Sequence, residues 1–243
     1  MKVLLLDIET APNVAYVWGL FDQNIAHNQL EESSYVLCWS AKWLGEEEIK
    51  FASCQRTSEK KMLKGIHKLL DEADVVVHYY GSKFDIPVLN REFVKYGYPP
   101  PSPYRQVDLK LACARMFKFE SNKLDYVSGA LELGAKVKHD GFQLWVDCME
   151  GKPEAWAKME EYNRYDVVLL EKLYWRLLPW IPGHPNASAY NDAECCPKCG
   201  GTAIQKRGTT IALTRRYQRY QCQGCGAWFR GSKTLTGKGA VMV

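Results

Sequence analysis

Two acidic residues, Asp7 and Glu9, stand at the end of the first apolar run of the sequence. Residues 3–6 are continuously apolar, which is typical of a strand that is buried on both faces. Side chains two positions apart on a strand point to the same face, so these carboxylates would lie side by side against a hydrophobic core. A divalent cation relieves their repulsion, because hard cations bind carboxylate oxygens. A strand that simply runs into a polar turn is the alternative at this point.

Two further acids occupy helical patterns. In residues 154–178, the spacing places Tyr162, Asp166 and Leu173 on one apolar face. An unpaired carboxylate on such a stripe is costly, and a metal shared with the N-terminal pair of acids would neutralise it. Asp85 begins another helical pattern that has proline in its first turn, so an ordinary helix N-cap is the alternative to a metal ligand there.

Two C-x2-C pairs lie near the end of the sequence, each followed by glycine. Their spacing predicts a structural zinc ion held by Cys196, Cys199, Cys222 and Cys225. Glycine lets the backbone turn so that its amides approach the thiolate sulfurs. Cys195 falls outside the C-x2-C spacing, which selects Cys196 instead.

Charge is unevenly distributed along the chain. Residues 195–243 contain nine Lys and Arg and no acid, which leaves 23 basic against 28 acidic residues in 1–194. This asymmetry predicts that the C-terminal module binds a polyanion, and a solvated basic terminus without a partner is the alternative. The cations that could contact a nucleic-acid backbone include Lys206, Arg207, Arg215, Arg216 and Arg219. The aromatic residues that could either stack on bases or form the core of the module are Tyr217, Tyr220, Trp228 and Phe229.

The composition is that of a globular protein with a sizeable core. The chain has 243 residues, of which 47% are apolar. We find no apolar run long enough to span a membrane and no pattern of a signal peptide. These observations predict a cytoplasmic protein without a membrane partner, in which the nine cysteines do not form disulfides.

The apolar patterns predict a succession of strands and helices that is typical of an α/β sheet. We expect strands at residues 3–6, 15–20, 35–44, 48–52 and 74–78, and helices at 58–71, from 85 onward, and at 107–117, 124–133 and 154–178. The polar segment 136–151 is expected to be irregular and to form a flap. The predicted domains are a body at 1–180, a linker at 181–194, a metal-binding module at 195–232 and a flexible tail at 233–243.

Three acidic motifs occur in a characteristic order. Asp7-x-Glu9, then Phe84-Asp85, then Tyr162-x-x-x-Asp166 resemble the DEDD superfamily of 3′–5′ exonucleases, and the tyrosine spacing resembles its DEDDy branch. The resemblance covers about residues 1–180 and implies a ribonuclease H-like mixed sheet flanked by helices. The C-terminal module resembles a zinc ribbon. One departure concerns the second motif, which commonly has an asparagine shortly before Phe-Asp, whereas this chain has Tyr80 followed by Gly81.

The resemblance implies a phosphodiester hydrolase that uses two metal ions. Asp7, Glu9, Asp85 and Asp166 would hold two Mg²⁺ or Mn²⁺ ions, and Tyr162 would orient the attacking water. The implied substrate is DNA or RNA, as a single strand or a 3′ end, and the implied source includes a phage whose protein acts in the host cytoplasm. A non-catalytic nucleic-acid-binding adaptor and a structure-specific endonuclease are the alternatives, and the sequence does not define an oligomeric state.

Overall fold

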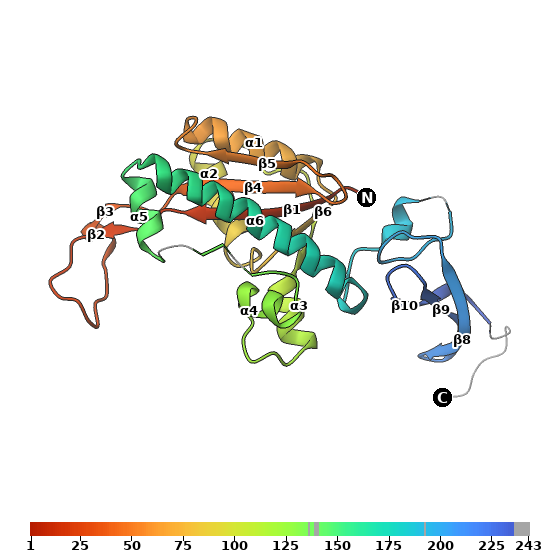
Figure 1. Ribbon diagram of the computed structural model, residues 1–243. Coiled ribbons are helices and arrows are strands. Elements are labelled where there is room, and N and C mark those ends of the chain that lie inside the picture. Colours follow the sequence, from red (N-terminus) through yellow and green to blue (C-terminus); the bar gives the residue numbers. More distant parts are fainter. Residues whose placement is uncertain (136, 139–140, 192, 236–243) are drawn as a thin grey trace.

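A mixed sheet of five strands forms the centre of the body (Figure 1). The computed structural model describes residues 1–135, 137–138, 141–191 and 193–235. The strand order is β5 (Ile49–Ser53), β4 (Val36–Trp43), β1 (Val3–Thr10), β6 (Val75–His78) and β7 (Arg105–Asp108). The pairs β1–β4 and β4–β5 are antiparallel, whereas β1–β6 and β6–β7 are parallel. The predicted α/β class with a mixed sheet is therefore confirmed.

Strand β1 lies in the middle of this sheet because both of its faces are apolar. Val3 and Leu5 pack into one hydrophobic cluster and Leu4 and Leu6 into another. The two clusters lie on opposite faces, since successive side chains of a strand alternate. Asp7 continues the series of Val3 and Leu5 and therefore points to the same side of the sheet as they do.

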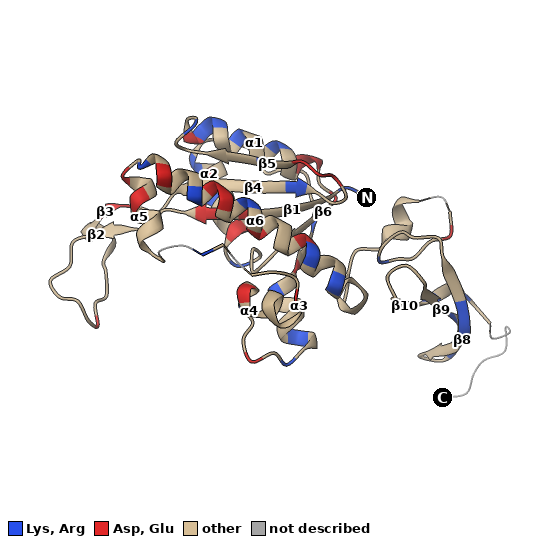
Figure 2. Ribbon diagram, viewed as in Figure 1, with Lys and Arg blue, Asp and Glu red and all other residues tan. Residues whose placement is uncertain are grey.

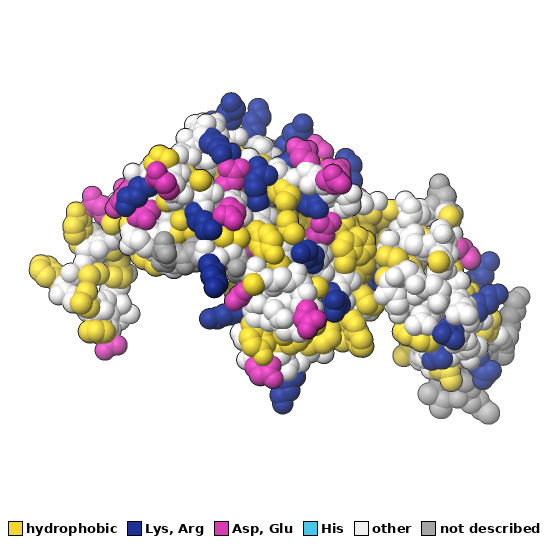
Figure 3. All heavy atoms as spheres, in the orientation of Figure 1, with side chains coloured by type: hydrophobic (Ala, Val, Ile, Leu, Met, Phe, Trp, Pro, Cys, Tyr) yellow, Lys and Arg dark blue, Asp and Glu magenta, His cyan; other side chains and the backbone are white. Residues whose placement is uncertain are grey.

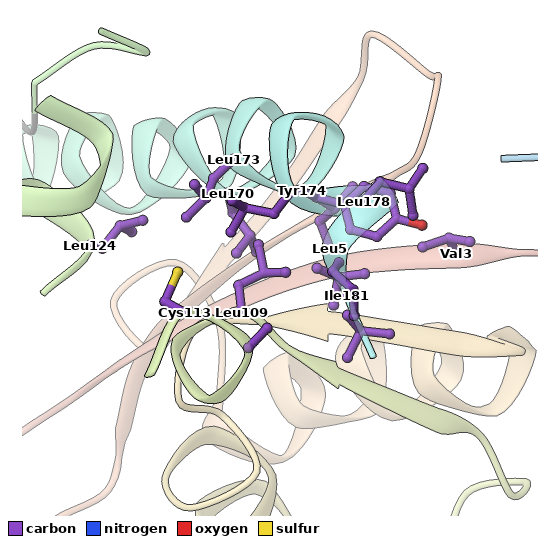
Figure 4. Close-up of a cluster of buried hydrophobic side chains, with 14 of the residues drawn as sticks. Val3, Leu5, Leu109, Cys113, Leu124, Leu170, Leu173, Tyr174, Leu178 and Ile181 are labelled. Atoms are coloured by element: carbon purple, nitrogen blue, oxygen red, sulfur yellow. The ribbon is translucent and has the colours of Figure 1, made fainter. Parts of the chain in front are cut away.

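Helices cover both faces of the sheet. On the side of Leu4 and Leu6, the covering helices are α1 (Glu59–Glu72) and α2 (Asp85–Lys95). On the other side, they are α3 (Leu109–Met116), α4 (Leu124–Ala130), α5 (Gln143–Met149) and α6 (Pro153–Leu177). Figure 4 shows side chains of α6, such as Leu170 and Tyr174, packed toward those of β1. No described helix has the length and apolarity needed to cross a membrane.

Polar contacts fix α6 across the sheet on both sides of the position of Asp166. Lys42 of β4 forms an ion pair with Glu171, and both side chains are largely buried. Arg164 donates from Nη1 to the backbone oxygen of Ile49 at 2.6 Å. These contacts set the position of the helix, because they join α6 to two different strands.

The structure differs from the predicted elements in the segment after β1. The expected strand 15–20 is reduced to β2 (Val14–Ala15), which pairs with β3 (Leu30–Glu32). Between them the chain forms an arm that includes a short 3-10 helix, η1 (His27–Gln29), and its side chains are solvent-exposed, with Trp18 at 99%. Figure 3 shows this projecting arm with apolar atoms at its tip. The aromatic residues there suggested a strand, but no packed surface lies beneath them.

Two other segments also differ from the expectation. The predicted helix 107–117 starts later than expected, because residues 105–108 form β7 at the edge of the sheet and α3 begins only at Leu109. The segment 136–151, expected to be irregular, contains α5 (Gln143–Met149), while residues 136, 139 and 140 lie outside the described residues.

The C-terminal module is a second, three-stranded antiparallel sheet of order β10–β9–β8. Its strands are β8 (Ile204–Ala212), β9 (Arg215–Cys222) and β10 (Trp228–Thr234), so the sheet continues two residues past the predicted end at 232. Residues 236–243, which make up most of the predicted tail, lie outside the described residues.

The segment between the body and this module is more ordered than the word linker suggests. It follows η2 (Leu178–Trp180) and contains η3 (Ala187–Tyr190). Ala187 is buried, and its amide donates to the carbonyl of Pro197 in the module. The domain boundaries themselves stay a prediction.

Candidate active site and cysteine cluster

Three of the predicted acids come together at the end of β1. Asp7, Glu9 and Asp166 place carboxylate oxygens within 4.8 Å of one another. Asp7 and Glu9 are partly buried, and Asp166 is 3% exposed. The i, i+2 spacing on β1 and the buried face of α6 produce this cluster, as the sequence predicted.

Two residues that the sequence did not single out hold these carboxylates in place. Asn163 of α6 is fully buried and donates from Nδ2 to Oδ2 of Asp7 at 2.7 Å. Trp145 of α5 donates its indole N–H to Oε2 of Glu9 at 3.1 Å. Asn163 directly follows Tyr162, so its neighbourhood carried a signal. Trp145 lies in the segment expected to be irregular, and nothing in its spacing identified it.

Tyr162 lies one turn before Asp166 on the buried face of α6. Its side chain is 7% exposed. Its ring packs edge-on against that of Trp145, with the ring centroids 5.9 Å apart. The tryptophan therefore contacts both the predicted catalytic tyrosine and the predicted metal ligand Glu9.

Asp85 lies beside this cluster but is not part of the group of three acids. It is the first residue of α2 and is 4% exposed. Its Oδ1 accepts a hydrogen bond of 3.2 Å from the amide of Ile8, between the two acids of β1. The N-cap of α2 is Phe84, which makes no side-chain capping bond, so the alternative of an Asp85 N-cap is wrong.

Burial raises the pKa of Asp85, and the negative charge of Asp108 raises it further. The hydrogen bonds from the backbone amides of Asp85 and Ile8 act in the opposite direction. A buried carboxyl group with a raised pKa is easiest to ionise when a cation lies near it.

The loop between β6 and α2 is held by a second carboxylate, that of Asp108. Its oxygens accept hydrogen bonds from the amides of Tyr80 and Ser82 and from the hydroxyl of Ser82. Tyr80 has a φ of +70°, a left-handed conformation that is uncommon for a residue with a side chain. At Gly81, an added Cβ would lie 2.5 Å from the ring of His78. The loop that delivers Asp85 is therefore tightly constrained.

A cleft of about 360 Å³ opens beside the acids. Asp7 and Asp166 line it together with Tyr80, Lys110 and Lys123. The ammonium group of Lys110 lies 3.7 Å from the centre of the Tyr80 ring. Phe84, which directly precedes Asp85, is 43% exposed. The lining of the cleft thus combines acids, cations and aromatic rings.

The four predicted cysteine ligands also come together, and Cys195 is not part of their group. The sulfur of Cys196 lies 3.7 Å from that of Cys225, and the sulfur of Cys199 lies 3.6 Å from that of Cys222. These distances exclude disulfides, whose sulfurs are about 2.05 Å apart. They fit zinc, since four sulfurs at about 2.3 Å from one ion in a tetrahedron are about 3.8 Å from one another.

Backbone amides complete the cysteine cluster. The amides of Lys198 and Gly201 donate to the sulfurs of Cys196 and Cys199, each at 3.4 Å. The amide of Cys225 donates to the sulfur of Cys222 at 3.5 Å. Such bonds favour the thiolate form that a metal requires. In the same way, the acidic cluster fits a hard divalent cation, which takes oxygen ligands.

Comparisons with known proteins agree with this architecture. A solved structure, that of the family B DNA polymerase from the hyperthermophilic archaeon Pyrobaculum calidifontis, is similar at a TM-score of 0.56 and 17% sequence identity. The match covers 73% of this chain and 24% of the polymerase chain, and it supports the fold alone. A search of the curated proteins found no match. The family model of the RNase_H superfamily matches residues 4–178, which include all four predicted acids. The chain therefore belongs to the RNase H superfamily.

Proposed function

We propose that this chain is a divalent-metal-dependent nuclease of the DEDDy type that removes nucleotides from the 3′ end of DNA or RNA. The observation that carries the proposal is the convergence of Asp7, Glu9 and Asp166 within 4.8 Å at the end of β1. Membership of the RNase H superfamily supports a nuclease, because enzymes with this fold generally use divalent metals to cleave nucleic acids.

The four acids would hold the cations. Asp7, Glu9 and Asp166 offer oxygens that are already close together, and Asp85 is fixed next to them through the amide of Ile8. Two bound Mg²⁺ or Mn²⁺ ions would supply an activated water and offset the charge of the phosphoryl oxygens. Asn163 and Trp145 restrict the rotation of Asp7 and Glu9, so the ligands need little reordering when a cation binds.

Tyr162 would orient the attacking water through its hydroxyl group. The residue lies one turn from Asp166, and its ring is fixed against Trp145. A hydroxyl group that is held in place can direct a water lone pair toward phosphorus without a change in its own protonation state. The proposed role is therefore positioning rather than metal binding.

The cleft next to the acids has a composition suited to a nucleotide. Lys110 and Lys123 can neutralise phosphate charge, and Tyr80 offers an aromatic surface to a base or a sugar. Tyr80 occupies the region in which related sequences commonly carry asparagine, so its contact with substrate would differ in kind from an amide hydrogen bond.

The cysteine cluster has a different role in this proposal. Cys196, Cys199, Cys222 and Cys225 would hold a structural zinc ion, because four thiolates leave no open position for a substrate. The module then folds as a zinc ribbon that is joined to the nuclease body.

The alternative of a non-catalytic adaptor predicts a degenerate acidic site. This chain instead has all four acids and the tyrosine, and two further side chains hold the acids in place. A structure-specific endonuclease has the same acids, so only the pattern of products separates it from an exonuclease.

The direction of cleavage tests the proposal. DNA and RNA strands labelled at the 5′ end are incubated with the full chain, with Mg²⁺, with Mn²⁺, or without added divalent cation. We expect a ladder that shortens from the 3′ end only when a cation is present. A single internal cut would favour the endonuclease, and binding without cleavage in every condition would favour the adaptor.

A further inference from the structure

The sheet of the C-terminal module has two chemically different faces. Residues directly opposite each other in neighbouring antiparallel strands share a face. Tyr220 is opposite Phe229 on one side and Lys206 on the other, so these three residues lie on one face. Gln221 is opposite Trp228 and therefore defines the other face, because it follows Tyr220 in β9.

The first face is the core of the module. The rings of Tyr220 and Phe229 stack with their centroids 5.6 Å apart and their planes 18° apart. Phe229 also packs against the cluster that contains Cys196 and Cys222. The sequence allowed two roles for Tyr220 and Phe229, stacking on bases or forming the core of the module. Their packing favours the core.

The second face combines arginines with aromatic rings. The guanidinium of Arg219 lies over the ring of Trp228, at 5.0 Å from its centre, and that of Arg230 lies over Tyr217 at 4.1 Å. Trp228 is 52% exposed. Arg207 joins this face from β8, where its guanidinium donates to the side-chain oxygen of Gln221 at 3.3 Å. We call Arg207, Tyr217, Arg219, Trp228 and Arg230 the arginine–aromatic face.

No acid compensates the charge of this face within its own module. Residues 195–243 contain neither Asp nor Glu. Three guanidinium groups from three neighbouring strands therefore repel one another unless an anion binds. Figure 2 shows basic residues on this sheet and acidic residues mainly on the distant body.

We propose that the arginine–aromatic face is a second nucleic-acid site, which binds a single strand away from the acidic cleft. Its arginines would contact phosphates, while Trp228 and Tyr217 stack on bases. A guanidinium group already lies over each ring, so the two rings are held in place before a base stacks on them. A duplex fits less well, because its bases are stacked on one another and are not available to the aromatic side chains.

Whether one strand can bind this face and the acidic cluster at the same time depends on the length of the strand. Asp166 and the end of α6 at Leu177 are separated by eleven residues of helix, which span about 16 Å. A strand with the roughly 3.4 Å phosphate spacing of B-DNA needs about five nucleotides to cover this length alone, and an unstacked strand, which is more extended, needs fewer. Shorter strands would occupy only the cleft, whereas longer strands would reach both sites.

Binding in the absence of cleavage tests this proposal independently of the proposed activity. We use the zinc-loaded full chain carrying Asp166→Asn and titrate it with labelled single-stranded DNA, single-stranded RNA and duplex DNA over a salt series. The test variant adds Arg219→Gln and Arg230→Gln. The matched control adds Lys206→Gln and Arg216→Gln, which removes the same charge from the core face.

The proposal predicts that the test variant loses affinity for single strands and that the slope of log K against log salt falls by about 1.4, or about 0.7 for each lost contact. The control variant retains most of the slope. Equal losses in the two variants would overturn the proposal, since they would indicate general attraction by the basic module. Unchanged binding in both would mean that the face has another partner, such as a protein.

Replacement of Trp228 by leucine tests the stacking contact. Base stacking contributes about 1–3 kcal/mol for each base, so Trp228→Leu should weaken binding of a long single strand by about 5- to 150-fold. Binding of heparin, a polyanion without bases, should change little. A loss of heparin binding by the same factor, with zinc content and circular dichroism unchanged, would contradict stacking. The DNA and RNA arms show which of the two nucleic acids the face prefers.

Discussion

At the scale of single residues, the candidate site depends on side chains that hold the acids rather than on the acids alone. Glu9 receives the indole N–H of Trp145, and Asp7 receives the amide of Asn163. Both donors come from helices on the same face of the sheet. Carboxylates that are fixed before a cation binds lose less conformational freedom on binding, so the donors should strengthen metal binding without touching the metal.

Trp145→Phe tests this supporting role. The variant retains an aromatic ring beside Tyr162 but loses the hydrogen bond to Glu9. We expect the Mn²⁺ concentration needed for half-maximal activity to rise about 10-fold or more, because loss of a group that supports a ligand typically costs 10- to 100-fold in metal affinity. Trp156→Phe is the matched control, since Trp156 is buried in the same hydrophobic cluster but, among the described residues, no hydrogen bond joins it to the acids. An equal shift in the control would attribute the effect to packing.

Tyr162→Phe separates the positioning of water from the binding of metal. The variant removes only the hydroxyl group from a buried ring. We expect kcat to fall by about 10- to 1000-fold, comparable to the loss of one hydrogen bond in the transition state. Calorimetry should show unchanged affinity for Mn²⁺. Weaker metal binding in this variant would show that the tyrosine acts through the ligands instead.

At the scale of elements, the loop from His78 to Asp85 is the most constrained part of the site. Asp108, at the end of β7, accepts hydrogen bonds from Tyr80 and Ser82, and the first turn of α2 then places Asp85 against β1. Parallel strands β6 and β7 end at the same edge of the sheet, which is why Asp108 can hold this loop. A small change in the loop should therefore move a carboxylate.

Gly81→Ala tests the loop. The new methyl group would lie 2.5 Å from the ring of His78, so the loop must shift. We expect the free energy of unfolding to fall by about 1–3 kcal/mol, as for overpacking of a core. We also expect kcat to fall under conditions in which the variant is still folded, because the shifted loop displaces Asp85. Thermal unfolding and kcat measure the two effects. Gly129→Ala is the control, because nothing lies within 4 Å of its added methyl group, and it should be neutral or stabilising. Full activity in Gly81→Ala would show that the loop does not position the site.

The sequence predicted well those strands and helices whose apolar residues follow the regular spacing of a strand or a helix. The apolar run of β1 and the helical face of α6 were sufficient to bring Asp7, Glu9 and Asp166 together, and the C-x2-C pairs were sufficient for the four cysteines. These patterns report the core directly, because a residue's burial follows from its position in a strand or a helix.

Patterns failed where tertiary contacts decide the structure. The aromatic residues 15–20 favour a strand locally, but the sheet provides no partner for them, and they form an exposed arm. Residues 105–108 become β7 because β6 pairs with them, which overrides the helical pattern that follows. The hydrogen bond from Trp145 to Glu9 joins residues that are 136 positions apart in the sequence. The spacing of residues around Trp145 therefore gave no sign of this contact.

At the scale of the whole molecule, the body and the C-terminal module are joined by specific contacts. The hydroxyl of Tyr174 in α6 lies 2.8 Å from Nε2 of His184, whose other ring nitrogen lies 2.7 Å from the carbonyl of Pro185. Lys198, between two of the cysteines, donates to the carbonyl of Ile181. These contacts connect the end of α6 with the metal-binding module.

Mild acid should weaken this connection. Burial, helped by the charge of Lys198 and opposed by the hydrogen bond with the carbonyl of Pro185, lowers the pKa of His184 to about 4, against about 6.5 in an unfolded chain. The unfolded chain therefore binds a proton that the folded chain excludes, so the contribution of neutral His184 is present above pH 6.5 and is lost as the pH falls toward 4.

Denaturant unfolding of the chain and of His184→Gln at pH 7.5, 6.0 and 5.0 measures this effect. The variant should be less stable at pH 7.5, and the difference should narrow as the pH falls. A difference that is independent of pH would show that the histidine is not held neutral. Its buried counterpart His78, whose pKa burial also lowers, remains in both proteins and so cancels in the comparison.

The rate of cleavage as a function of metal concentration, compared between the chain and Asp166→Asn, tests the central claim most directly. Asparagine preserves the size of the side chain but removes one of the three converging carboxylates. Single-turnover cleavage of a 5′-labelled strand is followed over a Mn²⁺ series. We expect saturable, metal-dependent cleavage by the chain and a loss of at least about 100-fold in the variant, with an unchanged circular dichroism spectrum. Cleavage by Asp166→Asn at the same rate and the same Mn²⁺ concentration would contradict a metal-dependent active site at these acids.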